Sequence, residues 1–308
     1  MSTATAPAIE SPDVKVAKPG TFKRLLRNPS VLIGGAILLL IALMGLASPW
    51  LSSLNPADIN PSNRNKLPGF ETTMRDDDGN KITQVARMGT DSLGRDIYTR
   101  VVWGARVSLT VGIAVATLSV AIGLAIGLAA GYFRALDGVV MRVMDGLMAV
   151  PAILVAIALV SLSGASLLTV IVAVTIPEIP RVVRLVRAIV LSIREEPYVE
   201  AAISVGTPTI KVLWRHVLPN TIAPLIVQAT FIAGSAILLE AALSFLGVGI
   251  PPEIPTWGNI MAEGRSVFQI LPHNILYPAA FLTLTVLAVN MLGDGLRDTL
   301  DPRMAKRV

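Results

Sequence analysis

Side chains able to carry out chemistry are few in this sequence, and their types exclude most classes of catalytic or metal site. The chain has 308 residues and no cysteine, which excludes disulfides, thiolate metal sites and cysteine nucleophiles. The two histidines, His216 and His273, stand in neither a metal-binding nor a catalytic-triad pattern. No Gly-Lys dipeptide occurs, so the phosphate-binding Walker A loop is absent. We therefore expect no catalytic residue, no metal site and no cofactor bound by this chain.

Three polar side chains within apolar runs, Asp145, Glu240 and Asn290, remain as candidates for a pore or a gate. If these runs cross a membrane, their carboxylates are functional-site hypotheses by default. Arg142 lies one turn before Asp145, so a local ion pair is a simpler account of that carboxylate. Glu240 lies about 30 Å along its helix from Asn220, near the end of a span rather than its middle. It suits a pore mouth or a structural hydrogen bond better than a proton relay.

The composition around these residues is that of a membrane protein. Hydrophobic residues make up 53% of the chain, charged residues only 15%, and the mean hydropathy is +0.66. A soluble domain of this length needs more charge to cover its surface. The formal net charge of +5 would suggest nucleic acid in a soluble protein, but basic loops orient the helices of a membrane protein. We expect the lipid bilayer, and no nucleic acid, as a partner.

Six apolar windows of about 20 residues, the length that crosses a bilayer, occur along the chain. The first could be a signal peptide, but its apolar run from Val31 to Ala47 is longer than a usual signal core and follows a long tail. This favours an uncleaved anchor. The pattern predicts an all-α integral membrane protein with six transmembrane helices, at residues 31–51, 107–130, 138–161, 164–180, 221–245 and 275–293.

The distribution of basic residues sets the expected orientation, because cytoplasmic loops collect Lys and Arg. Most of the 26 Lys and Arg residues fall on the side that holds both termini, so both termini are expected in the cytoplasm. Arg95, Arg100 and Arg106 conflict with this orientation, because they precede the second span on the outer side. Asp91 and Asp96 offset part of their charge. The predicted parts are a cytoplasmic tail (1–30), the first span (31–51), an external loop (52–106), a five-helix core (107–293) that includes the polar loop 197–219, and a cytoplasmic tail (294–308).

The external loop contains a segment with helical spacing. Leu93, Ile97 and Val101 recur every four residues. Tyr98 and Trp103 are aromatic residues of the kind that lie at membrane interfaces. We expect an outer amphipathic helix that lies on the membrane surface before the second span.

In the second span, Gly123, Gly127 and Gly131 are spaced by four residues, so they share one helix face. Small residues at this spacing let another helix backbone approach closely in lipid. Helix packing within this chain is favoured over an interface with a second membrane subunit.

A polar segment between the fourth and fifth spans, residues 197–219, is predicted to form two short helices with a sharp corner between them. Gly206 suits the position just after the first helix. Thr207 can cap the second helix, with Pro208 in its first turn. Pro219 is expected to break the second helix, so that Asn220, the next residue, caps the fifth span.

Each of the two helices has one apolar face, and together they are too short to form a domain. These faces can pack on the ends of this chain's own spans or insert into a partner protein, and the residue pattern alone does not decide between them. They consist of Tyr198, Ala201, Ala202 and Val205 in the first helix, and Ile210, Leu213, Trp214 and Val217 in the second.

The same segment resembles the EAA loop of bacterial ABC importer permeases. The matching residues are Glu200, Ala201, Ala202, Gly206, His216, Leu218 and Pro219. The general pattern prefers Ile where His216 stands, and RHVLPN is similar to the variant of the peptide-transporter branch. Other segments resemble signatures of that branch: GTDSLGRD from Gly89, GYFRALDGVVMRVMD ending at Asp145, EAALSFLGVG from Glu240 and GDGLRDTLDPR from Gly293 to Arg303. The chain resembles the C-type membrane subunit of the dipeptide/oligopeptide/nickel transporter family.

This resemblance implies a permease of the bacterial cytoplasmic (inner) membrane that imports peptides, dipeptides above all, by alternating access. The implied partners are a homologous B-type permease, two cytoplasmic ATPase subunits or domains that bind ATP and magnesium, and an extracytoplasmic substrate-binding protein. Nickel or another small solute is the alternative cargo. The two short helices then form a cytoplasmic coupling-helix loop that docks on an ATPase. Its implied ATPase-coupling residues are Glu200, Ala201, Ala202, Gly206, Thr207, Pro208, His216, Leu218 and Pro219.

Two other functional classes fit the sequence less well. A self-contained secondary transporter or channel needs ion-binding or proton-relay groups at the midplane, whereas the carboxylates of the predicted spans lie mainly near their ends. An intramembrane enzyme would need a catalytic or metal-binding arrangement that neither histidine provides.

Single cysteines can test the expected orientation, because the chain has none of its own. We expect Ser11→Cys and Ala305→Cys to be shielded from an impermeant thiol reagent in intact cells, and Asn80→Cys in the external loop to be labelled. Labelling at position 11 would contradict an arrangement of six spans with both termini inside. A shortened N-terminus would show that the first span is a cleaved signal.

Overall fold

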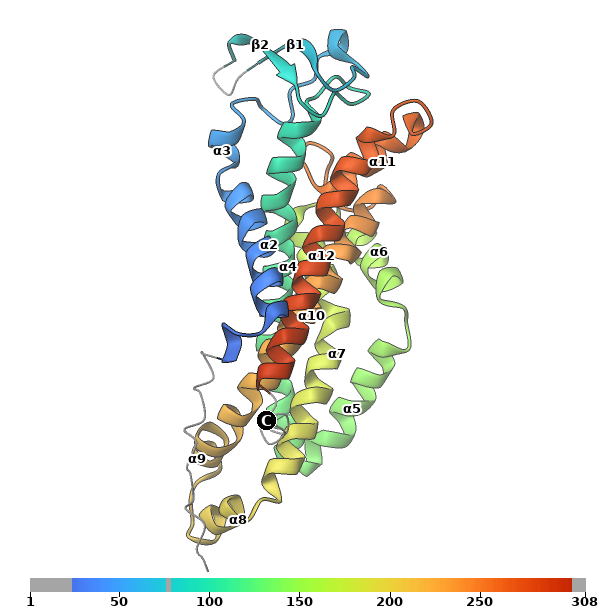
Figure 1. The fold of residues 1–308 in the computed structure, drawn as a ribbon. Coiled ribbons are helices and arrows are strands. Elements are labelled where there is room, and N and C mark those ends of the chain that lie inside the picture. The colour runs from blue at the N-terminus through green and yellow to red at the C-terminus, as the bar shows by residue number, and fades with distance from the viewer. Residues whose placement is uncertain (1–23, 76–78, 301–308) are drawn as a thin grey trace, which may run out of the picture.

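The structure, a computed structural model, describes residues 24–75 and 79–300. Most of the predicted N-terminal tail and the end of the predicted C-terminal tail lie outside these residues. The described chain is mostly helical and forms an elongated bundle (Figure 1). One end, which we name the hairpin end, carries strands β1 (Phe70–Arg75) and β2 (Lys81–Ala86). The other, the corner end, carries the short helices α8 (Pro197–Ser204) and α9 (Thr209–Val212).

The body of the bundle consists of long helices. They are α2 (Pro29–Leu46), α4 (Ile97–Tyr132), α5 (Arg134–Met148), α6 (Ala152–Ser163), α7 (Leu167–Arg194), α10 (Leu218–Phe245) and α12 (His273–Leu300). Shorter elements are α3 (Ser48–Leu51), α11 (Trp257–Gly264), the 3-10 turns η1 (Pro61–Asn63) and η3 (Arg265–Val267), and a π-helical turn, η2 (Leu213–Val217).

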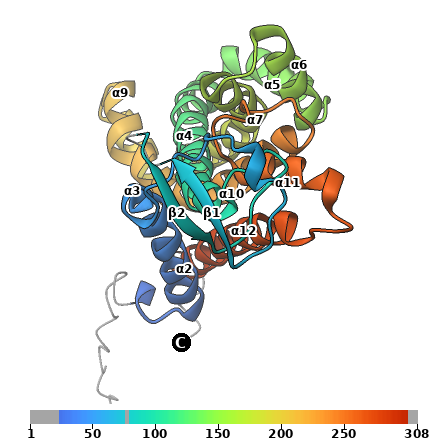
Figure 2. The ribbon, with the colours of Figure 1, turned by 90° about the horizontal axis from the view of Figure 1, so that it is seen from above.

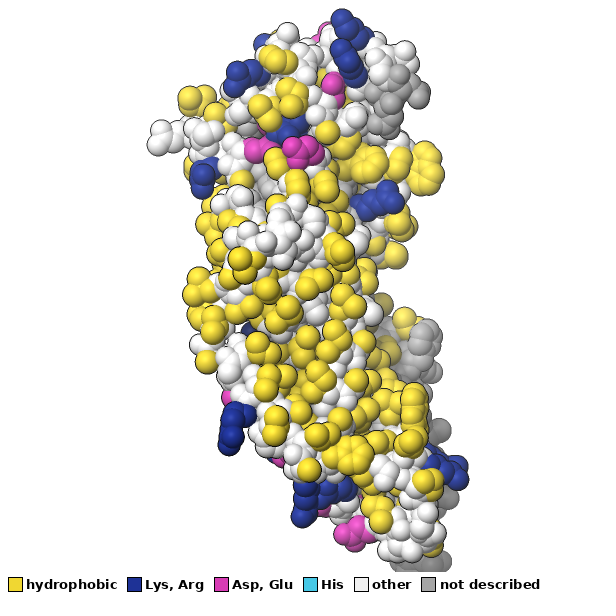
Figure 3. Space-filling view, turned by 180° about the vertical axis from the view of Figure 1, so that it is seen from behind, with side chains coloured by type: hydrophobic (Ala, Val, Ile, Leu, Met, Phe, Trp, Pro, Cys, Tyr) yellow, Lys and Arg dark blue, Asp and Glu magenta, His cyan; other side chains and the backbone are white. Residues whose placement is uncertain are grey.

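Within the described residues, four helices are long and apolar enough to cross a membrane: α2, α4, the continuous helix Thr209–Phe245, and α12. A fifth crossing results if α5 and α6, which meet at an angle of 86°, form one broken span. The chain is therefore a multi-pass membrane protein, although the predicted count of six is not confirmed. The predicted fourth span falls in α7, whose apolar run is interrupted by charged residues. Figure 3 shows the resulting apolar belt, with most of the charged side chains toward the two ends.

The predicted outer amphipathic helix is wrong. Ile97 and Val101 belong to the first turns of α4, which continues to Tyr132 as one helix, and both side chains are fully buried. The indole of Trp257 in α11 donates a hydrogen bond to the Val101 carbonyl at 3.1 Å. A four-residue spacing marks one apolar face of a helix but does not say whether lipid or protein covers that face. Here protein covers it, at the hairpin end.

The hairpin formed by β1 and β2 departs from the predicted all-α fold. The two strands pair antiparallel from Phe70↔Ala86 to Arg75↔Lys81, and they lie across the hairpin end of the bundle (Figure 2). Asn60 and Asn63 attach the hairpin to the segment that precedes it, because both side-chain amides donate to the Thr73 carbonyl at 2.7 Å. Its strands are short and mostly exposed, so they carry little of the apolar alternation by which a strand is recognised.

The glycine face of α4 packs against α7 of the same chain. A Cβ atom added at Gly123, Gly127 or Gly131 would lie 2.5–2.7 Å from a valine Cβ atom of α7. The three contacts are in register, because the valines are Val182, Val186 and Val190. We call this contact the α4–α7 seam. It is the internal packing that the sequence analysis favoured.

Matched alanine substitutions test the seam. Gly127→Ala places a methyl group 2.7 Å from the Cβ atom of Val186, and overpacking of this kind costs about 1–3 kcal/mol. Gly138→Ala in α5 meets no atom within 4 Å and should stabilise by up to about 1 kcal/mol, because alanine is the better helix former. Thermal unfolding of the purified variants should therefore shift in opposite directions. Equal stabilisation by both changes would contradict a close-packed seam.

Candidate functional site

The corner between α8 and α9 is built by local backbone geometry. Gly206 follows α8 with a φ angle of +78°, a conformation that favours glycine. The amide of Gly206 donates to the Ile203 carbonyl at 2.9 Å, and the amide of Thr207 donates to the Ala202 carbonyl at 3.1 Å. These two bonds form the Schellman motif that ends many helices. The predicted role of Gly206 as the residue just after the helix is thus confirmed.

The second helix of the corner differs from its prediction. Pro208, not Thr207, is the N-cap residue of α9, and no side chain caps this helix. Pro219 does not break the helix either, because α9, η2 and α10 form one continuous helix, Thr209–Phe245. The wider π-helical turn, which ends at Val217, lies within one turn of Pro219 and accommodates its missing amide hydrogen. Asn220 donates from its side chain to the His216 carbonyl at 2.6 Å instead of capping a new helix.

Continuity has a mechanical consequence, because the corner is the end of a membrane-spanning helix and not a separate loop. On its other side, only Glu195 and Glu196 separate α7 from α8. The corner is therefore continuous with α10 and joined to α7 by two residues, the connectivity that a displacement of the corner would act through.

The apolar side chains of the corner divide into two sets. Val199, Val212 and Val217 are buried against the chain itself. The others point away from the bundle, with exposures of 82% for Val205, 71% for Ile210 and 69% for Trp214. Packing on the chain's own helix ends therefore accounts for the first set only. We name the exposed set, Tyr198, Ile203, Val205, Ile210 and Trp214, the corner patch.

The polar and small residues proposed for ATPase coupling lie on or beside this patch. Glu200, Ala201, Gly206, Pro208 and Pro219 are exposed, whereas Ala202, Thr207, His216 and Leu218 are half-buried. The imidazole of His216 lies against the ring of Tyr198, with 5.7 Å between ring centroids. The structure thus brings all of the candidate coupling residues to the corner end.

The pore and gate candidates do not come together in the structure. The predicted pairing of Asp145 with Arg142 is wrong, because Asp145 instead accepts a hydrogen bond of 2.6 Å from Arg184 of α7. Arg187, one turn further along α7, binds Asp137 of α5 through two hydrogen bonds. These two ion pairs link α7 to α5, the helix that precedes the 86° bend between α5 and α6. A pairing between elements is not visible in the one-turn spacing from which the local pair was predicted.

Glu240 is fully buried in α10 near the hairpin end. It accepts a hydrogen bond of 2.8 Å from Ser244, and the hydroxyl side chains of Ser108 and Thr256 lie beside its carboxyl group. This arrangement joins α4, α10 and the segment before α11, so the geometry favours the structural role over the pore mouth. Asn290 is half-buried in α12, next to Gly234 of α10.

Sequence reasoning missed a further buried carboxylate, Glu178 of α7. It is 3% exposed, pairs with Arg181 at 3.1 Å and accepts a hydrogen bond of 3.2 Å from Ser235 of α10. The sequence feature that could have revealed this carboxylate is its position between Pro177 and Pro180, inside the predicted fourth span. The pair also shows why α7 needs the bundle, since charged groups in a membrane must face protein or a water-filled cavity.

A buried ion cluster at the hairpin end explains two of the three arginines that conflicted with the predicted orientation, Arg95 and Arg100. The third, Arg106, is exposed and lies over the ring of Trp103. Arg95 binds Asp91 at 2.7 Å and also binds Glu263 of α11. Arg100, which is fully buried, lies 3.4 Å from Asp91 and 3.3 Å from Glu263. Two arginines thus face two carboxylates, and their charge is neutralised within the chain.

Asp96 has a different role from the one predicted. Its carboxylate caps α4, because it accepts hydrogen bonds of 2.7 Å from both the amide and the hydroxyl of Thr99. Burial raises the pKa of the Asp96 carboxyl, and the Thr99 hydrogen bonds oppose that shift. The charge that the sequence analysis assigned to Asp96 is supplied instead by Glu263.

These features define a class, a multi-pass helical membrane protein whose long helices end in an exposed two-helix corner. Comparison with known proteins gives the family. Residues 119–306 match the family described as binding-protein-dependent transport system inner membrane component. Residues 20–68 match the N-terminal TM domain of oligopeptide transport permease C. The chain belongs to this family of transport permeases.

Several relatives cover most of the chain. The probable peptide ABC transporter permease protein y4tQ of Sinorhizobium fredii is 48% identical over 281 residues, 91% of each chain. The dipeptide transport system permease protein DppC of Alkalihalophilus pseudofirmus is 41% identical, over 92% of this chain and 89% of that one. The glutathione transport system permease protein GsiD of Pectobacterium atrosepticum is 38% identical, over 98% of this chain and 96% of that one.

The fold is similar to that of a solved transporter. An inward-facing structure of the MetNI methionine ABC transporter matches with a TM-score of 0.53 and 18% identity, covering 65% of this chain and 95% of that chain. This likeness supports the helical architecture of the permease core.

Proposed function

We propose that this chain is the C-type permease subunit of an ATP-driven importer for short peptides, with dipeptides as the favoured cargo. The relatives named for peptide, dipeptide and glutathione transport support peptides as the substrate class. The match to the N-terminal domain of permease C supports the C-type subunit. Nickel or another small solute carried by the same machinery is the alternative.

The corner patch is the observation that carries this proposal. An exposed apolar surface on two short helices, joined rigidly to α7 and α10, suits a knob that inserts into a partner. In the proposed complex that partner is a cytoplasmic ATPase, which binds ATP and magnesium, while this chain performs no catalysis. Closure of two ATPases would move the corners together and rock the long helices as rigid bodies.

The rest of the assembly follows from this role. The corner end lies in the cytoplasm with both termini, and the hairpin end faces the extracytoplasmic substrate-binding protein. A homologous B-type permease supplies the second half of the pathway. The chain crosses the bacterial inner membrane six times, with α5 and α6 as the third crossing and α7 as the fourth. The register of the α4–α7 seam supports α7 as a crossing, because it runs beside α4 over three consecutive contacts.

Two substitutions at Gly206 test whether the shape of the corner couples ATP hydrolysis to transport. A side chain added there meets no atom within 4 Å, so this chain itself requires only the left-handed backbone. Asparagine tolerates that backbone, whereas a β-branched residue does not. Gly206→Asn should keep peptide uptake near the wild-type level in the reconstituted complex. Gly206→Val should lower it by about fivefold to thirtyfold, because a conformational cost of about 1–2 kcal/mol corresponds to that range.

Both variants should still insert and pair with the other permease, since the long helices are unchanged. ATP hydrolysis by the Gly206→Val complex should no longer respond to loaded binding protein. Wild-type uptake together with wild-type stimulation of ATP hydrolysis in Gly206→Val would contradict the coupling assignment and leave the corner as local packing.

A further inference from the structure

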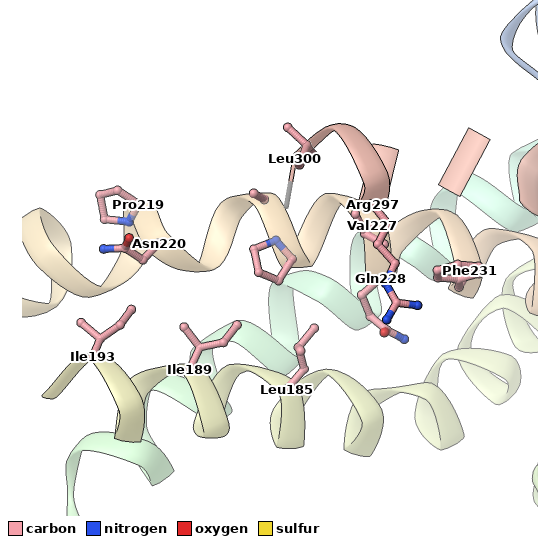
Figure 4. A pocket seen from close by; sticks show the side chains of 12 residues that line it. Leu185, Ile189, Ile193, Pro219, Asn220, Val227, Gln228, Phe231, Arg297 and Leu300 are labelled. Carbon is pink, nitrogen blue, oxygen red and sulfur yellow. The ribbon is translucent and has the colours of Figure 1, made fainter. Parts of the chain in front are cut away.

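A pocket of ≈ 760 Å³ lies between α7, α10 and α12 in the half of the bundle nearest the corner end. This volume is within the range of small-molecule sites. In Figure 4, α7 and α10 form the two long walls, and the end of α12 closes the third side. The apolar side chains of these walls include Leu185, Ile189 and Ile193 of α7, Val227 and Phe231 of α10, and Leu300 of α12.

Polar groups stand at the two ends of the pocket. Arg297 and Gln228 lie together near one end, one helical turn before Phe231, with their side chains directed into the space between α10 and α7 (Figure 4). Asn220 lies at the other end. Arg297 is the one charged residue of the lining, and no ion pair joins it to another described side chain. Within the described residues the pocket therefore presents a cation without an acidic partner beside a neutral amide, a combination that binds a carboxylate or another oxyanion.

The separation of these groups sets the length of a fitting ligand. Asn220 and Gln228 are eight residues apart on one continuous helix, a distance of about 12 Å along its axis. A fully extended tripeptide spans about 10 Å. A peptide of two or three residues can thus place its carboxylate at Arg297 and its apolar side chains along the walls. The Asn220 side-chain oxygen can accept a hydrogen bond from the ammonium end, since its nitrogen already donates to His216.

The direction of the apolar walls favours a water-soluble ligand over a lipid. Gly295, two residues before Arg297, packs against Val31 in the first turns of α2, so Arg297 lies near the end of the first apolar span. From this level most of the lining extends toward Ile193 and Pro219 at the corner end, and Phe231 alone lies beyond Arg297 on the other side (Figure 4). A lipid with its headgroup at Arg297 would direct its acyl chains the opposite way.

We propose that this pocket binds the carboxylate end of a short peptide on the corner side of the membrane, with Arg297 and Gln228 as the residues that hold the carboxylate. This inference rests on the proposed function, in which that side is the cytoplasm. We name the pocket the exit site, because an imported peptide reaches it after crossing the membrane. Peptide that accumulates in the cytoplasm can occupy the same site and slow further import.

Equilibrium binding to the assembled transporter tests the exit site. The complex is placed in phosphatidylcholine nanodiscs without its binding protein, and labelled Ala-Phe is compared with the same dipeptide amidated at its C-terminus. Arg297→Gln should weaken Ala-Phe binding by about tenfold or more, the usual effect of losing a charge-assisted hydrogen bond. It should leave the weaker binding of the amide unchanged. Arg297→Lys should restore part of the affinity, and Arg142→Gln, an exposed change outside the pocket, should have no effect.

The outcomes separate the exit site from the other proposals. Equal affinity of the wild type and Arg297→Gln for Ala-Phe would overturn it. So would an effect of Arg297→Gln that is confined to nanodiscs containing phosphatidylglycerol, because Arg297 would then bind a lipid headgroup. Peptide uptake measured on the same preparation tests the proposed function separately. Uptake without Arg297-dependent binding overturns the exit site alone, and Arg297-dependent binding without uptake overturns the import role alone.

Discussion

The α4–α7 seam is the contact on which the rest of the structure depends. Close approach of two backbones is possible there because three glycines of α4 face three valines of α7. The seam holds in the bundle a helix that could not stand alone in lipid, since α7 carries the buried Glu178 and several arginines. Once α7 is fixed, its charged face can bind α5 through Asp137 and Asp145. Its far end sets the position from which the corner projects.

The corner is firmly connected to the bundle, because one side of it is continuous with α10 and the other is joined to α7 by only two residues. The helix Thr209–Phe245 carries the corner directly into the bundle, and the π-helical turn keeps Pro219 from interrupting it. The tight turn at Gly206 fixes the angle between α8 and α9. At the opposite end, the buried cluster of Arg95, Arg100, Asp91 and Glu263 joins the start of α4 to α11. Different interactions thus stabilise the two ends of the bundle: backbone geometry at the corner, and ion pairs at the hairpin end.

Sequence reasoning succeeded where the determining interactions are local. The position of Gly206 just after a helix was predicted from the order of residues within one short segment. The glycine face of α4 was predicted from a four-residue spacing. It failed where partners are distant in sequence: Arg100 and Glu263 are 163 positions apart.

Other misses have different causes. Ile97 was assigned to the membrane surface because its spacing does not reveal what covers the helix face. Pro219 was expected to break its helix, because a π-helical turn has no clear signal in the sequence. The six apolar windows marked where long helices lie but did not show that the third bends by 86° or that the fourth continues as a helix to Arg194.

The central claim, that the corner patch docks on a partner ATPase, can be measured directly because the chain has no cysteine of its own. A single cysteine at Val205, the most exposed side chain of the patch, is joined to a short thiol-to-amine cross-linker in the assembled complex. Thr83→Cys, an exposed position in β2 at the opposite end, serves as the control. The account predicts that the cross-linked product from Val205→Cys contains the ATPase subunit and that the product from Thr83→Cys does not. A product from Val205→Cys that contains only permease chains, in a complex that still hydrolyses ATP, would contradict it.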